Sequence, residues 1–364
     1  MEREAVEAID AHNHVFPPAT IDMLRRDRKT WGVEVEDGPD GRVIRHQEGY
    51  TYAAPDEFFV PQAKLQALAA CRINGAVLCV APPMFFYDRP AERTAELHRA
   101  TNEGLHAFAQ SAPDRFRTLA TVPLQSVDRA IDELEYAVTR LGMRGVEVGT
   151  SINGRRLDEP QFAPFLQAVE RLGVVLMVHP AYVGATHGLD RFYMTNTVGN
   201  PLETAVVAAR FICGGLLDRY PSLQVFLVHG GGYLPYQIGR LDRAALVRPE
   251  LESLVSAPRD YLRRFLFDTI TFDAHALSFL LNQVGRDRVV LGSDAPFDMR
   301  DPDPVATLEM ATRDEETRDR VAALTARRAF QWNGEPIPAE PPPVSERSFL
   351  GHEPDGAAAD RQRR

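Results

Sequence analysis

The chain has 364 residues, of which 44% are hydrophobic, and its formal net charge at pH 7 is −10. This acidic balance argues against a nucleic-acid partner, which would need a basic surface to displace counterions from phosphates. The chain has no apolar run near the ~20 residues that span a bilayer and no signal-peptide pattern after Met1, so we expect a soluble, cytoplasmic protein with no membrane partner.

Eight short apolar runs alternate with segments of helical periodicity along the chain. A chain of this length can bury the core of one large domain, and eight strands that each lead into a helix close a parallel barrel. One helical segment starts after Ser126, which we expect to act as its cap. We therefore predict an α/β fold, a (β/α)8 TIM barrel, with strands at residues 8–12, 75–81, 117–123, 145–149, 174–179, 224–229, 265–269 and 289–294.

Two stretches fall outside this repeat. Residues 31–60 hold two short runs around a turn rich in Gly and Asp, which indicates a small β-hairpin insertion after the first strand. The insertion leaves from the C-terminal face of the barrel, so it is either a wall of the site or a decoration without function. Residues 334–364 are rich in Pro and charge, which predicts a mobile C-terminal tail after a barrel domain of residues 1–333.

Two histidines, His12 and His14, follow each other at the end of the first predicted strand. Residues i and i+2 of a strand point to the same face, so both imidazoles can turn toward one metal ion. Two histidines this close also occur by chance at exposed strand ends. The pair alone therefore leaves the metal site as a hypothesis.

Three further polar residues come where later apolar runs end. His179 ends the run at 173–178, His229 ends the run at 223–228, and Asp294 ends the run at 289–293. The C-terminal ends of the strands are where barrel enzymes keep their chemistry. Taken singly, each His is also explained as a core histidine and Asp294 as a helix cap. The coincidence of four strand ends favours a site.

The cysteines and lysines limit the kinds of metal site. Cys71, Cys79 and Cys213 are scattered without Cys-x-x-Cys spacing, so we expect reduced core residues and no thiolate site. Lys29 and Lys64 are the only lysines, and neither lies in a predicted strand. A carbamylated lysine that bridges two metals is therefore not expected, and we predict a single metal ion.

The motifs together resemble the amidohydrolase superfamily, in the subgroup of metal-dependent decarboxylases typified by aminocarboxymuconate-semialdehyde decarboxylase. The resemblance covers roughly residues 7–333 and rests on DAHNH at 10–14, VHP at 178–180, VHGGG at 228–232 with Gly239 and Arg240, and LGSDAPF at 291–297. It implies that one zinc is held by His12, His14, His179 and Asp294. It also implies that His229 is the acid/base beside the metal.

The chemistry of these side chains agrees with such roles. Three neutral imidazoles and a carboxylate suit Zn²⁺, with Mn²⁺ as the alternative. Zinc can lower the pKa of a bound water from ~15.7 to about 7, and a nearby imidazole such as that of His229 can then shuttle the proton. Asp294 can also accept a hydrogen bond from that water, which gives it a catalytic duty besides metal binding.

The resemblance implies non-oxidative decarboxylation of a small unsaturated or aromatic carboxylic acid. Protonation of the carbon that bears the carboxylate lets carbon dioxide leave without an organic cofactor. In the family, an arginine matching Arg240 reaches the active site of the neighbouring subunit, which implies substrate binding by Arg240 and a homodimer. The position that matches the family's substrate-binding arginine after the first strand falls near Tyr52 and Ala53. Arg42 and Arg45 lie within reach in sequence, but hairpin arginines are more often solvated surface residues, so we do not carry this role over.

Aromatic residues offer other substrate contacts. Phe192 and Tyr193, in the loop after His179, and Phe297, just after Asp294, suit a planar substrate, although packing explains each of them equally well. The ligand set also fits a metal-dependent hydrolase of an amide, lactone or ester, because a barrel and its site do not fix the substrate. A third alternative is a barrel that keeps a metal only for stability. The VHGGG motif with Gly239 and Arg240 favours the decarboxylase.

Overall fold

The computed structural model describes residues 7–38, 41–49, 51–181 and 188–332. Eight parallel strands follow each other around one sheet, and backbone hydrogen bonds from Ala11 to Leu291 and from His14 to Ala295, both 2.8 Å, return its last edge to its first. The predicted (β/α)8 TIM barrel is therefore confirmed. Its strands are β1 (Ile9–Val15), β5 (Gly75–Val80), β6 (Phe116–Thr121), β7 (Gly145–Gly149), β8 (Val175–His179), β9 (Gln224–Leu227), β10 (Phe265–Asp268) and β11 (Val289–Val290).

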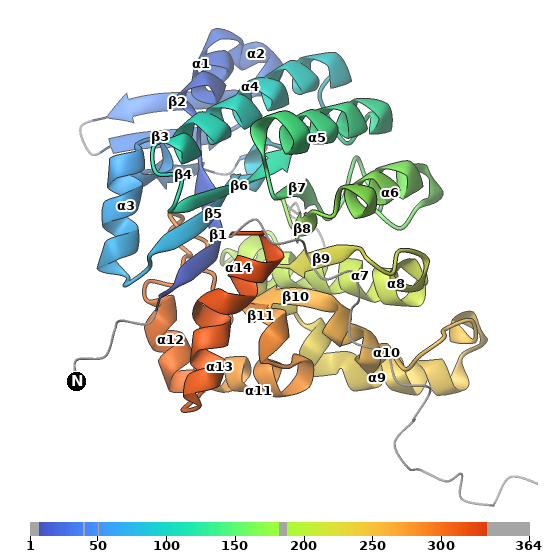
Figure 1. The fold of residues 1–364 in the computed structure, drawn as a ribbon. Helices are drawn as coiled ribbons and strands as arrows, with labels where there is room; N and C mark the ends of the chain where they lie inside the picture. The colour runs from blue at the N-terminus through green and yellow to red at the C-terminus, as the bar shows by residue number, and fades with distance from the viewer. Residues whose placement is uncertain (1–6, 39–40, 50, 182–187, 333–364) are drawn as a thin grey trace, which may run out of the picture.

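Helices surround the strands, as Figure 1 shows. The longer ones are α3 (Pro61–Ala70), α4 (Ala91–Gln110), α5 (Val127–Leu141), α6 (Ala163–Leu172), α7 (Asn200–Cys213), α9 (Leu234–Val247) and α11 (Ala274–Val284). Shorter helices complete the layer: α8 (Leu216–Arg219), α10 (Pro258–Tyr261), α12 (Pro304–Ala311), α13 (Glu315–Asp319) and α14 (Thr325–Ala329). Ser126 stands at the N-cap of α5 as predicted, but its side chain makes no capping hydrogen bond. None of the described helices is both long and apolar enough to cross a membrane.

The inserted segment is larger than a hairpin. The predicted pair is present as β2 (Val33–Gly38) and β3 (Gly41–His46), and β4 (Thr51–Ala54) adds a third antiparallel strand. Helices α1 (Pro18–Arg26) and α2 (Arg28–Trp31) lie between β1 and this sheet in the chain. The predicted tail, residues 334–364, lies outside the described residues.

Side chains fill the interior of the barrel. Val77, Met177 and Phe226 are fully buried in one apolar cluster, and Phe330, after α14, packs against Phe226 with 6.3 Å between ring centroids. The strands are therefore buried on both faces, which explains why they read as continuous apolar runs. Polar side chains lie instead at the ends of the strands, where the candidate site is.

Candidate active site

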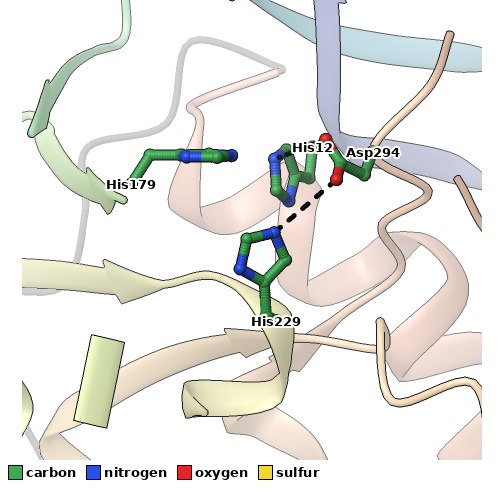
Figure 2. Close-up of side chains that lie close together, drawn as sticks. All are labelled: His12, His179, His229 and Asp294. Carbon is green, nitrogen blue, oxygen red and sulfur yellow. Dashed lines mark ion pairs between the residues drawn. The ribbon is translucent and has the colours of Figure 1, made fainter. Parts of the chain in front are cut away.

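Four side chains meet at the C-terminal ends of the barrel strands. His12 comes from β1 and His179 ends β8, while His229 follows β9 and Asp294 follows β11. One possible ligand atom of each lies within 4.8 Å of those of the other three. Figure 2 shows these side chains converging from separate elements, with His229 Nε2 3.6 Å from Asp294 Oδ2.

His14 borders this group from the same strand as His12. Its Nε2 lies 3.1 Å from Nε2 of His12 and 3.0 Å from Oδ1 of Asp294. Strand β1 extends to Val15, beyond the predicted end at residue 12, so both histidines are strand residues and share one face. The structure therefore brings together all five residues that the sequence placed at a metal site.

The backbone is in the left-handed region at two of these residues, with φ of 55° at His229 and 63° at Asp294. Such conformations cost free energy for residues other than glycine and concentrate at functional sites. The turn that carries His229 also needs glycines. A Cβ on Gly232 would lie 2.0 Å from the carbonyl oxygen of Pro201, and one on Gly231 would lie 2.6 Å from Phe267. The glycine triplet therefore lets this turn pack closely against β10 and α7.

The other ring nitrogens of the three buried histidines have acceptors. Nδ1 of His12 lies 2.9 Å from Oδ2 of Asp268, Nδ1 of His14 lies 3.2 Å from the carbonyl of Val80, and Nδ1 of His179 lies 2.7 Å from that of Pro180. Carbonyls and carboxylates accept only, so each Nδ1 carries the proton. In the neutral form of each imidazole, Nε2 is then an unprotonated donor atom for a metal. Nε2 of His179 is buried and has no hydrogen-bond partner among the described residues.

The pKa shifts of His14, His179 and Asp294 agree with this protonation state, whereas contacts with Asp268 and Asp294 raise the pKa of His12 above its usual value in spite of its burial. Burial lowers the pKa of His14 to about 4. Burial and the neighbouring imidazoles hold the pKa of His179 well below its usual value. Burial alone would raise the pKa of Asp294, but contacts with His14 and His229 hold it well below its usual value. Neutral imidazoles and an ionised carboxylate are the forms that bind metal ions.

The spacing of the donor atoms also fits one ion. Two atoms that each lie about 2.0–2.2 Å from one Zn²⁺ stand roughly 3–3.5 Å apart. The separations from His14 Nε2 to His12 Nε2 and to Asp294 Oδ1 are 3.1 and 3.0 Å, and that from His12 Nε2 to Asp294 Oδ1 is 3.5 Å. Two unprotonated nitrogens at such a distance repel each other, and a cation between them would remove the repulsion. The cluster could therefore hold a metal ion.

Asp268, at the end of β10, is a site residue that the sequence analysis missed. Its carboxylate contacts His12 and also accepts hydrogen bonds from the backbone N–H groups of His229 at 2.9 Å and Gly230 at 2.7 Å. It is fully buried. A signal existed, because an aspartate at the end of a predicted strand is the same pattern that singled out Asp294.

A second buried group, His14, Cys79 and Glu147, lies behind the cluster, and its possible ligand atoms also lie within 4.8 Å of one another. Sγ of Cys79 is 3.3 Å from Nδ1 of His14. Burial raises the pKa of Cys79 and of Glu147 well above their usual values. The thiol of Cys79 therefore keeps its proton at neutral pH, and burial disfavours the ionised form of Glu147. All three cysteines are free, but only Cys79 is buried as predicted, whereas Cys71 and Cys213 are half-buried.

Lys64, on α3, is buried behind β1 with an exposed fraction of 1%. Its ammonium donates to Oδ1 of Asn13 and, at 3.0 Å, to the carbonyl of His14. Burial lowers the pKa of this lysine to about 7. Lys64 therefore supports the strand that carries the paired histidines.

Two cavities adjoin the cluster. The first, of about 150 Å³, is lined by His179 and Asp294 together with aromatic and polar side chains, among them Tyr52, Tyr193, Phe297 and Asp298. The second, of about 440 Å³, is lined by His229, Asp294 and aromatic residues that include Tyr236. Asp294 lines both, so a bound molecule in either cavity would lie beside the cluster.

Some of the predicted substrate contacts line a cavity and others do not. Tyr193 and Phe297 line the first cavity. Phe192 is 80% exposed, does not line either cavity and packs with the guanidinium of Arg191, 4.9 Å from its ring centroid. Arg240 is exposed on α9 and lines neither cavity of its own chain.

An eight-stranded parallel barrel that gathers imidazoles and a carboxylate at the ends of its strands defines the chain as a barrel enzyme. The chain belongs to the amidohydrolase family, because residues 9–332 match the Amidohydro_2 family model, described as Amidohydrolase.

Three known proteins illustrate what the chain is similar to. It is 31% identical to 2-amino-3-carboxymuconate-6-semialdehyde decarboxylase from Dictyostelium discoideum, over 85% of this chain and 87% of that protein. It is 29% identical to gamma-resorcylate decarboxylase from Rhizobium sp. (strain MTP-10005), over 76% and 88% of the two chains. A solved structure of dihydroxybenzoic acid decarboxylase from Polaromonas sp. JS666, with bound manganese and an inhibitor, superposes with a TM-score of 0.74 at 24% identity, over 90% and 97% of the two chains.

Proposed function

We propose that this protein is a metal-dependent decarboxylase that releases carbon dioxide from a small aromatic or unsaturated carboxylic acid. The observation that carries the proposal is the meeting of His12, His179, His229 and Asp294 beside two cavities. The names of the two sequence relatives, both decarboxylases that align over most of the chain, support the same reaction.

We assign His12, His14, His179 and Asp294 as the metal ligands. The side chains of His12 and His14 are fully buried, whereas that of His229 is 12% exposed and lines a cavity. A ligand needs only the metal, but an acid/base must reach the substrate, so His229 takes the second role. The imidazole-rich donor set favours Zn²⁺, while the bound manganese of the structural relative makes Mn²⁺ the alternative.

The site residues have separate roles in the proposed reaction. A divalent ion held by His12, His14, His179 and Asp294 would supply a Lewis acid beside the substrate. Nε2 of His229 delivers a proton to the carbon that bears the carboxylate. The bond from that carbon to the carboxylate then breaks, carbon dioxide leaves, and the electron pair returns to the π-system. Phe297 and Tyr193 hold the planar acid and keep water from its ring.

We also propose that the chain acts as a homodimer in which Arg240 of each copy reaches the other's cavity. Arg240 is exposed, and no residue of the described ranges forms an ion pair with it. Mixing the His229→Ala and Arg240→Ala variants tests this arrangement, because one site of each mixed dimer would be intact. Partial recovery of activity is the expected result, and no recovery would contradict the proposal.

The first experiment is a metal analysis of the purified protein, joined to a screen of aromatic and unsaturated acids that records carbon dioxide release and simple hydrolysis. We expect about one zinc or manganese per chain and carbon dioxide release that a chelator abolishes. Hydrolysis of amides, lactones or esters without release of carbon dioxide would show that the protein is a metal-dependent hydrolase and not a decarboxylase. A protein without bound metal that gains none on titration would overturn the site.

A further inference from the structure

The walls of both cavities lack positive charge. Among the described residues that line them, none is an arginine or a lysine. The charged groups are Asp294, which belongs to the proposed metal site, and Asp298, which lines the first cavity. Most of the remaining polar groups are hydroxyls and amides, such as those of Thr195 and Asn196. The metal, with Arg240 of a partner in a dimer, can balance one substrate carboxylate, but the described lining residues include no lysine or arginine for a second.

Tyr52, on β4, lines the first cavity and carries a neutral hydroxyl. Its hydroxyl oxygen lies 3.1 Å from Nε2 of His46. Its ring stacks on Phe16 with centroids 6.2 Å apart and meets the edge of Phe297 at 5.5 Å. Burial lowers the pKa of His46 to about 3, so the His46 imidazole is neutral at neutral pH. The hydroxyl is therefore fixed in place beside a neutral partner.

Asp298 and Tyr193 both line the first cavity. Burial and the negative charges of Asp298 and Asp294 raise the pKa of the Tyr193 phenol. A carboxylate in this position accepts a hydrogen bond from a hydroxyl group but repels another carboxylate. Asp298 therefore disfavours a dianionic substrate and favours one with a hydrogen-bond donor on its ring.

We propose that the cavity selects aromatic acids that carry one carboxylate and at least one hydroxyl group, with Tyr52 and Asp298 as the residues that determine this specificity. The inference rests on the proposed function, because it concerns the acid that the same site would decarboxylate. Tyr52 recognises the neutral polar substituent, and Asp298 rejects a second carboxylate.

Three matched acids test the selectivity: 2-hydroxybenzoate, benzoate, which lacks the hydroxyl group, and 4-hydroxyisophthalate, which adds a second carboxylate. Their binding to the metal-loaded enzyme is measured by calorimetric titration. We expect 2-hydroxybenzoate to bind roughly tenfold or more tightly than either of the other acids. Equal or tighter binding of 4-hydroxyisophthalate would overturn the proposal.

Two variants separate the contributions of Tyr52 and Asp298 to the choice of substrate. Tyr52→Phe should weaken the binding of 2-hydroxybenzoate roughly tenfold and leave that of benzoate unchanged, because the ring keeps its packing while the hydroxyl contact with the substrate is lost along with the bond to His46. Asp298→Asn should strengthen 4-hydroxyisophthalate and leave benzoate unchanged. Tyr136→Phe, a change at a tyrosine bonded to Glu103 on the protein surface, is the matched control. A Tyr52→Phe variant that weakens benzoate and 2-hydroxybenzoate equally would contradict the assigned role.

Carbon dioxide release is recorded for the same acids, which separates this inference from the proposed function. Release from 4-hydroxyisophthalate at a rate equal to that from 2-hydroxybenzoate would overturn the selectivity and leave the decarboxylase in place. The expected binding preferences without carbon dioxide from any aromatic or unsaturated acid would overturn the reaction and leave the selectivity in place.

Discussion

The carboxylate of Asp268 lies 2.9 Å from Nδ1 of His12, and through its other contacts it holds the turn on which His229 sits. A proposed metal ligand and the proposed acid/base are thus positioned by one buried side chain. Partners of this kind fix the tautomer and orientation of a metal-binding imidazole, and their loss weakens metal binding.

The Asp268→Asn variant should therefore bind metal roughly 10–100-fold more weakly than the wild type. An amide keeps the shape of the side chain but turns a donor toward one of the N–H groups or toward Nδ1–H of His12. A competition titration with a chelating dye measures the affinity. Asp273→Asn is the matched control, since Asp273 caps α11 at the surface and Asn caps equally well. An unchanged metal affinity in Asp268→Asn would remove the positioning role.

If His229 is the acid/base and the other histidines are metal ligands, their removal should affect different properties, turnover in one case and metal content in the other. His229→Ala should keep its metal and lower turnover roughly 10²–10⁴-fold, because only the general acid is removed. His14→Ala should lower the metal content, as should His12→Ala and Asp294→Ala. Elemental analysis and carbon dioxide release measure the two properties, with His275→Ala on α11 as the control. His229 lies within the cluster of possible ligands. Loss of metal from His229→Ala would therefore show that His229 is itself a ligand.

The strands and the cluster could be predicted because their signals are local. Each barrel strand is a continuous apolar run, and His179, His229 and Asp294 come directly after such runs. The barrel geometry then brings the strand ends together without further information. The eighth strand is shorter than predicted, Val289–Val290, and Asp294 lies beyond its end with a positive φ.

The other features depend on contacts between distant residues. Lys64 lies on a helix, and its partner Asn13 is 51 residues away, so its burial has no local signature. Strand β4 has four residues without alternating hydrophobicity and is recognisable only through its pairing with β3. The directions of Phe192 and Arg240, both outside the cavities, likewise cannot be derived from spacing in the sequence.

Buried Lys64 predicts a pH dependence of stability. Its pKa falls from 10.5 to about 7 on folding, so between these values the unfolded chain holds a proton that the native chain lacks. The free energy of unfolding therefore rises with pH across this window, by at most about 1.4 kcal/mol per pH unit from this group. Chemical unfolding at several pH values should show this rise in the wild type.

The Lys64→Met variant should lose that part of the rise. At high pH it should be less stable, because the carbonyl of His14 and the amide oxygen of Asn13 lose their donor, while at low pH the removal of the buried ammonium offsets this cost. Lys29→Met, at an exposed position on α2, is the control. Equal pH slopes for Lys64→Met and the wild type would contradict a lysine that loses its proton on folding.

Gly232 predicts that the turn behind His229 tolerates no side chain. Gly232 and Gly154 both have positive φ, 63° and 78°, so alanine is strained at either position. Only at Gly232 does the added Cβ collide with backbone, at 2.0 Å from the carbonyl oxygen of Pro201, while nothing lies within 4 Å at Gly154. Gly154→Ala should therefore cost about 1 kcal/mol and keep its activity. Gly232→Ala should displace the turn with His229 and lose turnover as well as thermal stability. Equal melting temperatures and equal turnover in the two variants would mean that the turn can move away from α7 without harm.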